Sequence, residues 1–186
     1  YTAFGITRDE ANRRIKAALS ESTIKELLKP AVKAALLTSE FLEYLLTKEV
    51  VLSNTTLATI VTNIERYSTD LAVLAAYIDY DVKDKKRDAG WAHPSILQAL
   101  AHIRNIELRI WRLGAQGVLT PHQTHEQDFS VYTRPNVESR TDVLFINNNH
   151  FELLDFIGYE ENSIPNEGIY PLDCSQNQVV TVRGFL

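Results

Sequence analysis

The chain has 186 residues, of which 45% are hydrophobic and 23% are charged, and its formal net charge is −5. This length fits one domain with a substantial core, and no segment has the roughly 18 uninterrupted apolar residues of a membrane helix. We therefore expect no membrane span. An acidic chain without a long basic run disfavours a surface that tracks phosphates, so we do not expect nucleic acid as a partner.

The cysteine content indicates the kind of cellular compartment in which the protein works. Cys174 is the one cysteine of the sequence, so an intrachain disulfide and a stapled secreted scaffold are excluded. A reducing, intracellular compartment fits best. The chain opens at Tyr1 and contains no methionine, so we expect that residue 1 is not the natural start of the protein.

Helical patterns occupy the first part of the chain. Thr7 followed by Glu10 has the spacing of a capping box and predicts a helix that runs to the neighbourhood of Ser20. A second helix is expected to begin near Ser22. Pro30 lies inside its apolar pattern and predicts a break or kink there.

Three more helical patterns follow. A helix is expected to restart at Ser39, and Asn54 or Thr55 can cap the next one. Apolar residues with i, i+3, i+4, i+7 spacing then predict two helical faces. These residues are Leu57, Ile60, Val61 and Ile64 in the first face, and Leu71, Leu74, Ala75 and Ile78 in the second.

The segment Asp79–Gly90, "DYDVKDKKRDAG", is charged and poor in apolar residues. Its composition indicates a solvated connection between lobes, and a binding role for its lysines is the alternative. After it, Pro94 takes the N1 position of a predicted apolar helix. Ile106–Trp111 then alternates between apolar and other residues, which predicts a half-buried strand.

Strand patterns dominate the rest of the chain. "FSVYT" predicts a short strand, and "NQVVTVRGF" is a candidate for a last one. "DVLFI" and "HFELLDF", separated by "NNN", predict the two strands of a β-hairpin, because asparagine tolerates the positive φ of tight loops. Helices first and strands later, with one helix-to-strand unit between them, predict an α+β fold.

His150 opens the second strand of this hairpin, and Glu152 projects to the same face two residues later. A carboxylate there can accept a hydrogen bond from one ring nitrogen and leave the other nitrogen as a general base. One of the asparagines at 147–149 is an alternative group to orient the ring. Spacing alone leaves open that His150 is only a surface residue beside a turn.

Cys174 is a candidate nucleophile by residue type alone. It follows a proline and precedes a polar turn, and no helix pattern after it would activate the thiol, so a bystander role is favoured. Trp91 and Trp111 are interpreted as core or cleft-wall residues.

His122 and His125 have the H-x-x-H spacing of a metal site, and Glu126 adjoins them. Pro121 and the polar surroundings indicate a loop rather than a helix, and further ligands are lacking. We therefore expect no metal site.

"GWAHPSILQALAHIRNIELRIW" followed by "DVLFINNNHFELLDF" resembles the second half of the ovarian tumour (OTU) family of cysteine proteases, which remove ubiquitin from proteins. Trp91, an apolar helix from Ser95, a strand, and then the "HFE" that begins at His150 match the family in order. The acid of the family is commonly Asp or Asn, so Glu152 departs from the family pattern in length.

At the front of the chain, "YTAFGITRDEA" resembles the continuation of the Asp-Gly-x-Cys turn of the family, in the style of OTU proteases that intracellular bacteria inject into host cells. The resemblance places the nucleophilic cysteine one or two residues before Tyr1. It covers roughly residues 1–12 and 90–156. It implies an OTU-like, papain-type fold, with one catalytic domain over 1–186 and an inserted helical lobe at 22–80.

The resemblance implies a deubiquitinase that hydrolyses ubiquitin isopeptide bonds with a cysteine thiolate. His150 and Glu152 would be catalytic, and Asn149, Tyr1 and Trp91 would lie near the site. It implies ubiquitin or polyubiquitin as partner, a monomer without cofactor, and the host cytoplasm if the protein is a secreted bacterial effector. The alternative is a catalytically inactive OTU-like module that binds ubiquitin or another protein. An unrelated helical interaction protein with an appended hairpin is a third interpretation.

Overall fold

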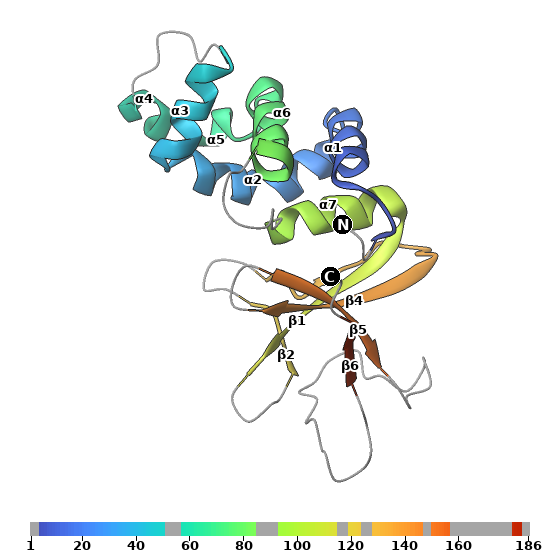
Figure 1. Cartoon of the computed structure of the whole chain (residues 1–186). Helices are drawn as coiled ribbons and strands as arrows, with labels where there is room; N and C mark the ends of the chain where they lie inside the picture. The colour runs from blue at the N-terminus through green and yellow to red at the C-terminus, as the bar shows by residue number, and fades with distance from the viewer. Residues whose placement is uncertain are drawn as a thin grey trace. The chain divides into compact units, whose positions relative to one another are not determined.

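A computed structural model describes residues 4–50, 57–84, 93–114, 119–123, 128–146, 150–156 and 180–183. Within these residues, seven α-helices and a mixed β-sheet confirm the predicted α+β class (Figure 1). The chain divides into a helical unit, Ile6–Ile103, and a sheet unit, which comprises Arg104–Leu186 and a short N-terminal stretch. The assignment of 22–80 as a lobe inserted into a single domain over 1–186 stays a prediction.

The helices bury apolar side chains along almost the whole helical unit. None of the described helices is both long and apolar enough to cross a membrane. The elements are α1 (Arg8–Ala17), α2 (Ser22–Leu36), α3 (Ser39–Thr47), α4 (Leu57–Thr62), α5 (Ile64–Tyr67), α6 (Leu71–Asp79), a π-helical turn (Tyr80–Asp84) and α7 (Pro94–Arg104).

Helix α1 begins where the capping box predicted. The Thr7 hydroxyl accepts a hydrogen bond from the Glu10 amide at 3.2 Å, which satisfies one of the four amides that lack a partner at a helix start. Farther along, Lys16 Nζ lies 2.8 Å from Asp79 Oδ2 of α6, and Asn12 Nδ2 donates to the other oxygen at 2.9 Å. These contacts join α1 to α6 inside the helical unit.

Helix α2 continues through Pro30, so a break there is wrong, and the kink that was predicted as the other possibility stays a prediction. A proline inside a helix removes one hydrogen bond and costs about 3 kcal/mol. Ile24, Leu28 and Val32 lie on both sides of it and are fully buried, and burial of each such side chain contributes roughly 1.5–3 kcal/mol. Burial of the shared face therefore outweighs the local cost. A new helix begins at Ser39, as predicted.

The single helix predicted from Leu57 to Ile64 is divided into α4 and α5. The division lies at Asn63, whose side-chain amide donates to the Thr59 carbonyl at 3.0 Å. Such a local bond competes with continuation of the helix. The candidate caps Asn54 and Thr55 lie outside the described residues.

The prediction of a solvated connection over Asp79–Gly90 is wrong for its first part. The π-helical turn continues α6 and buries Asp81 and Val82, each of which is 1% exposed. The Asp81 carboxylate accepts a hydrogen bond from the His93 amide at 3.2 Å, immediately before α7. This acid is therefore structural. The end of the segment lies outside the described residues.

Helix α7 begins at Pro94, as predicted, and its first eight residues are all buried. The helix ends at Arg104. The next residue, Asn105, has a φ of 53° and connects the helix directly to strand β1 (Ile106–Leu113). The half-buried pattern predicted for this strand is wrong, because Arg109 and Trp111 are 6% and 4% exposed. Burial is continuous from Leu108 to Trp111, so side chains on both faces of this part of β1 are buried.

The strands of the sheet have the order β2-β1-β4-β5-β6. Strand β3 also pairs with β1 and is not part of this linear order. Strands β1 and β4 are parallel, whereas the other pairs are antiparallel. The predicted hairpin, short strand and last strand are confirmed, and β2 is an addition. The remaining bounds are β2 (Leu119–Pro121), β3 (Val131–Tyr132), β4 (Ser139–Ile146), β5 (His150–Phe156) and β6 (Val180–Arg183).

The register assigns the strand residues to two faces. Trp111, Leu144 and Leu154 lie on one face and form a buried cluster with Leu119. We call this the Trp111 face. The opposite face carries Leu108, Ile110 and Val143, which are buried as well.

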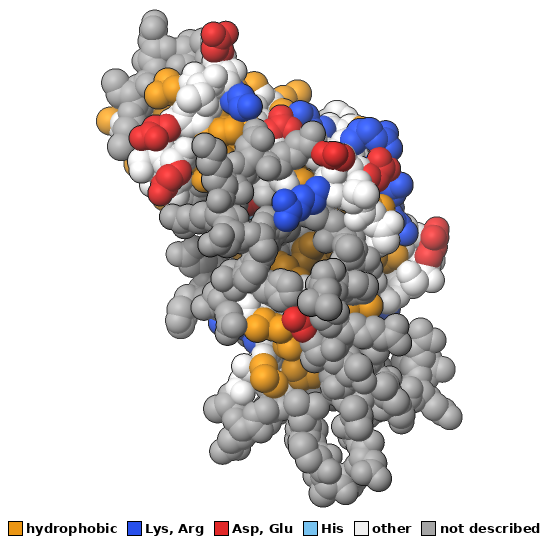
Figure 2. Space-filling model, viewed as in Figure 1, with side chains coloured by type: hydrophobic (Ala, Val, Ile, Leu, Met, Phe, Trp, Pro, Cys, Tyr) orange, Lys and Arg blue, Asp and Glu red, His pale blue; other side chains and the backbone are white. Residues whose placement is uncertain are grey.

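Charged side chains of both signs are interspersed over the helical unit (Figure 2). Lys29 Nζ lies 3.0 Å from Glu65 Oε2, and Lys33 contacts the other oxygen of the same carboxylate. Exposed pairs of this kind contribute little to stability, because water screens them and ordering two long side chains costs entropy. Burial of the apolar faces therefore supplies most of the stability of this unit.

Candidate functional site

His150 is the first residue of β5, at the position that the sequence predicted. Its backbone pairs with Ile146 at the end of β4, and Glu152 pairs with Leu144. Because alternate residues of a strand share a face, His150 and Glu152 both belong to the Trp111 face. Glu152 is partly buried there. The sheet therefore fixes the backbone of both predicted catalytic residues.

The three residues predicted to lie near the site, Tyr1, Trp91 and Asn149, lie outside the described residues. Cys174 does as well. Trp111, which was interpreted as a core or cleft-wall residue, is confirmed as both, because it is buried and lines a pocket.

His122 is a packed core residue rather than part of a polar loop. It is 3% exposed, its ring stacks on Phe129 with centroids 5.9 Å apart, and it lies 4.7 Å from the ring of Phe145. His125 lies outside the described residues. In the described ranges, no three potential ligand side chains form a metal-binding group.

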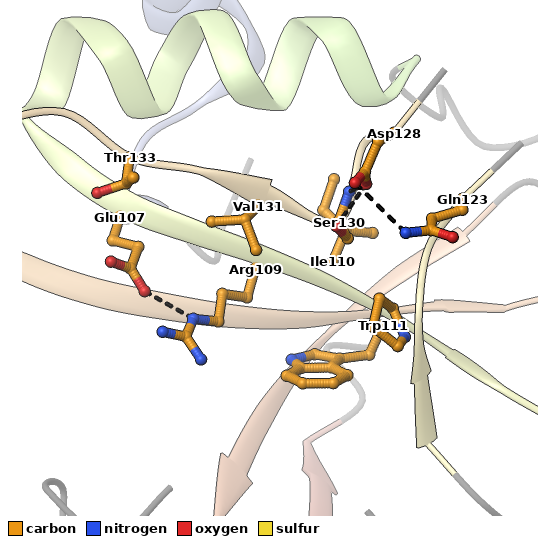
Figure 3. A pocket seen from close by; sticks show the side chains of 10 residues that line it. Glu107, Arg109, Ile110, Trp111, Gln123, Asp128, Ser130, Val131 and Thr133 are labelled. Atoms are coloured by element: carbon orange, nitrogen blue, oxygen red, sulfur yellow. Dashed lines mark hydrogen bonds and ion pairs between the residues drawn. The ribbon is translucent and has the colours of Figure 1, made fainter. Parts of the chain in front are cut away.

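A pocket of about 600 Å³ opens beside β1 in the sheet unit (Figure 3). Its volume falls in the range of roughly 300–1,000 Å³ that is usual for ligand sites. Strand β2 pairs with Trp111–Leu113 of β1 and β3 pairs with Leu108 and Arg109, and the backbone of Ile110 between them bonds to Ser130 and His122. The polar lining residues of the pocket are Glu107, Arg109, Gln123, Asp128, Ser130 and Thr133.

Sequence reasoning missed this pocket. The short strand β2 has no recognisable pattern of its own, and the lining residues come from segments up to about 25 positions apart. The signal that was available is the pair Glu107 and Arg109, opposite charges two positions apart in a predicted strand.

Arg109 and Glu107 form an ion pair within the pocket. The Arg109 Nε donates to Glu107 Oε1 at 2.6 Å, and the two side chains are 7% and 18% exposed. They lie two residues apart on the same face of β1, so the strand itself sets their separation. Their charges compensate one another within the pocket lining.

Trp111 is held by a second polar network. Its indole Nε1 donates to Asp142 Oδ1 at 2.8 Å, and Arg140 NH2 donates to the same oxygen at 2.8 Å. Arg140 Nε lies 2.7 Å from Asp142 Oδ2 without hydrogen-bond geometry, so that contact is ionic only. The network fixes the indole that forms part of the pocket wall.

Asp128 lies at the other end of the pocket from the Glu107–Arg109 pair (Figure 3). Its Oδ1 accepts the Ser130 amide at 2.8 Å and also the Ser130 hydroxyl, and its Oδ2 accepts Gln123 Nε2 at 3.4 Å. Burial raises the pKa of Asp128, but the hydrogen bonds from Ser130 outweigh it and bring the pKa below its usual 3.8. This carboxylate is therefore ionised at neutral pH.

No family model matches this chain, and no curated protein or solved structure matches it either. The order of the elements and the geometry of the sheet unit are therefore the basis for a functional proposal.

Proposed function

We propose that this protein is a deubiquitinase of OTU type, a cysteine protease with an OTU-like, papain-type fold. The observation that carries the proposal is the place of His150. It is the first residue of β5, the second strand of the hairpin, and lies two positions before Glu152 on the same strand. The succession of α7, β1 and the β4–β5 hairpin also supports it, because the resemblance implies this order.

The chemistry follows from a cysteine and a histidine in contact. The thiolate attacks the isopeptide carbonyl carbon, and His150 gives its proton to the lysine amine as the carbon–nitrogen bond breaks. His150 then takes a proton from the water that hydrolyses the thioester. Glu152 orients the imidazole through one ring nitrogen. The proposal requires a cysteine that precedes Tyr1 in the full-length protein, with Cys174 as a bystander.

The proposal includes ubiquitin or polyubiquitin as the partner. Residues 22–80 form an inserted lobe of a single catalytic domain over 1–186, and the protein acts as a monomer in a reducing compartment, the host cytoplasm in the case of a bacterial effector. The chemistry uses side chains alone, without a cofactor.

Cleavage of linked ubiquitin tests the proposal. The full-length protein is incubated with a panel of diubiquitin linkages, and we expect His150→Ala to reduce the cleavage rate by at least about 100-fold, because general acid–base catalysis contributes on that order. His102→Ala is the control. Its ring contacts Glu21 in the helical unit, so cleavage should be retained.

Equal cleavage by the native protein and His150→Ala would contradict the proposal. A ubiquitin probe with a C-terminal alkyne adds a second readout, because it labels only a reactive cysteine. Labelling should be unaffected by Cys174→Ser. Reversible ubiquitin binding without labelling would instead support the inactive binding module.

A further inference from the structure

The described lining of the pocket beside β1 carries a surplus of negative charge. Two carboxylates and one guanidinium are among the described residues that line it, and their formal charge is −1. Glu107 and Arg109 pair with one another at 2.6 Å, so the surplus charge belongs to Asp128. Among the described residues, no lysine or arginine pairs with Asp128, and the nearby imidazole of His122 acts on it through charge without a hydrogen bond. A cationic group is the electrostatic complement of this site.

The carboxylate of Asp128 is held in position and can still accept further hydrogen bonds. Its partner Ser130 is 7% exposed and fixes Oδ1 through two hydrogen bonds, whereas Asp128 itself is exposed. An ionised carboxylate has about four acceptor positions. From the described residues, Oδ2 receives one bond, a long one from Gln123 at 3.4 Å. The carboxylate therefore presents an oriented oxygen with remaining acceptor capacity.

The rest of the pocket suits an apolar body. Trp111, Pro121, Ile110 and Val131 contribute carbon surface to its lining, and Val131 is 45% exposed. Figure 3 shows Val131 between the Asp128 cluster and the Glu107–Arg109 pair. A volume of about 600 Å³ is far larger than one ammonium group needs. The occupant thus combines a charged head with hydrocarbon.

We propose that this pocket binds a ligand that joins an ammonium or guanidinium group to an apolar body, with Asp128 as the anionic partner of the cation. The inference is independent of deubiquitination. The pocket lies at the β2–β3 edge of β1, and β4 separates β1 from the strand of His150. A free amine and a basic side chain of a peptide present the same chemistry.

Matched charged and uncharged probes test the inference and distinguish the two sources. The free-amine arm compares 4-phenylbutylamine with 4-phenylbutanol. The peptide arm compares acetyl-Ala-Arg-Ala amide with its citrulline analogue. Binding is followed by fluorescence in a Trp91→Phe background, where Trp111 is the one remaining tryptophan, and by calorimetry on the unsubstituted chain.

We expect the charged member of at least one pair to bind at least about tenfold more tightly than its uncharged analogue, since hydrogen bonds to charged groups are worth about that factor. Asp128→Asn should remove this preference. Glu138→Gln is the matched control, because it deletes an exposed carboxylate of the same unit outside the pocket lining. It should leave the preference intact.

Three outcomes would overturn the inference. They are equal affinity for the charged and uncharged probes, an unchanged preference in Asp128→Asn, and no binding of any probe in the millimolar range. The first and third outcomes are measured by calorimetry on the unsubstituted chain. They therefore test the inference even if Asp128→Asn fails to fold.

Discussion

Trp111 shows how the surroundings of a residue depend on partners far along the chain. Alternation along β1 predicted a half-buried strand, whereas the residue type indicated that Trp111 is a core or cleft-wall residue. The indole is buried because Leu119 and Leu144 pack around it and Asp142 accepts its N–H. Asp142 lies 31 positions away, and no local spacing in the sequence connects the two residues.

Removal of the acid should take an acceptor away from a buried and from a partly buried donor. We expect Asp142→Ala to lower the free energy of unfolding by about 3 kcal/mol, because the buried Trp111 N–H and the partly buried Arg140 guanidinium lose this acceptor. Urea denaturation followed by circular dichroism measures the change. Glu138→Ala, at an exposed acid just before β4, should change stability by less than about 0.5 kcal/mol. Similar losses in both variants would show that the network contributes nothing specific.

Glu10 provides a pH-dependent test at the same scale. Hydrogen bonds from Arg13 and then from Arg14 lower its pKa from 4.5 to about 2. Because the folded pKa lies below the unfolded one, the contribution of Glu10 to stability is fully present above pH 4.5 and is lost as the pH falls toward 2.

Arg13→Gln should raise the pKa of Glu10 toward 4.5, since it removes the largest of these interactions. The titration midpoint of the Glu10 carboxyl carbon, measured by NMR, reports the shift. Arg8→Gln removes an exposed arginine of the same helix and should leave the midpoint in place. An identical midpoint in the Arg13 variant would contradict the assigned cause.

At the scale of single elements, α2 shows that a core face can override a helix breaker. We expect Pro30→Ala to raise the free energy of unfolding by on the order of 2 kcal/mol, because alanine restores the backbone hydrogen bond and has the higher helix propensity. Thermal and urea unfolding measure the gain. Thr23→Ala, an exposed position of the same helix, is the control and should change stability by a few tenths of a kcal/mol. A Pro30 variant that is no more stable would mean that the proline is accommodated without cost.

The elements that sequence reasoning found are those whose signals are local. The α1 cap at Thr7, the start of α7 at Pro94 and the β4–β5 hairpin each depend on residues within a few positions of one another. Strand β2 and the continuity of α2 depend on distant neighbours, and so do the contacts of the pocket. For the candidate site, the place of His150 on its strand was predictable, whereas Asp128 and its charge were not.

At the scale of the whole molecule, the two units differ in how their contacts are distributed along the chain. Helices make their hydrogen bonds within one turn, so α1 to α7 are built from near neighbours. The sheet unit combines a hairpin, in which Ile146 pairs with His150, and a parallel pair, in which Ile106 pairs with Ser139. The prediction of an α+β fold from the order of patterns held because helical and strand patterns are segregated in this chain.

The parallel pairing of β1 with β4 has a kinetic consequence. The β4–β5 hairpin closes a turn of three residues and can form on a timescale of roughly microseconds. Strands β1 and β4 meet only after a loop of about thirty residues has closed, and loop closure carries an entropic cost before any contact compensates it. Folding of the sheet unit should therefore begin at the hairpin and be limited by the arrival of β1, the strand that completes the pocket wall.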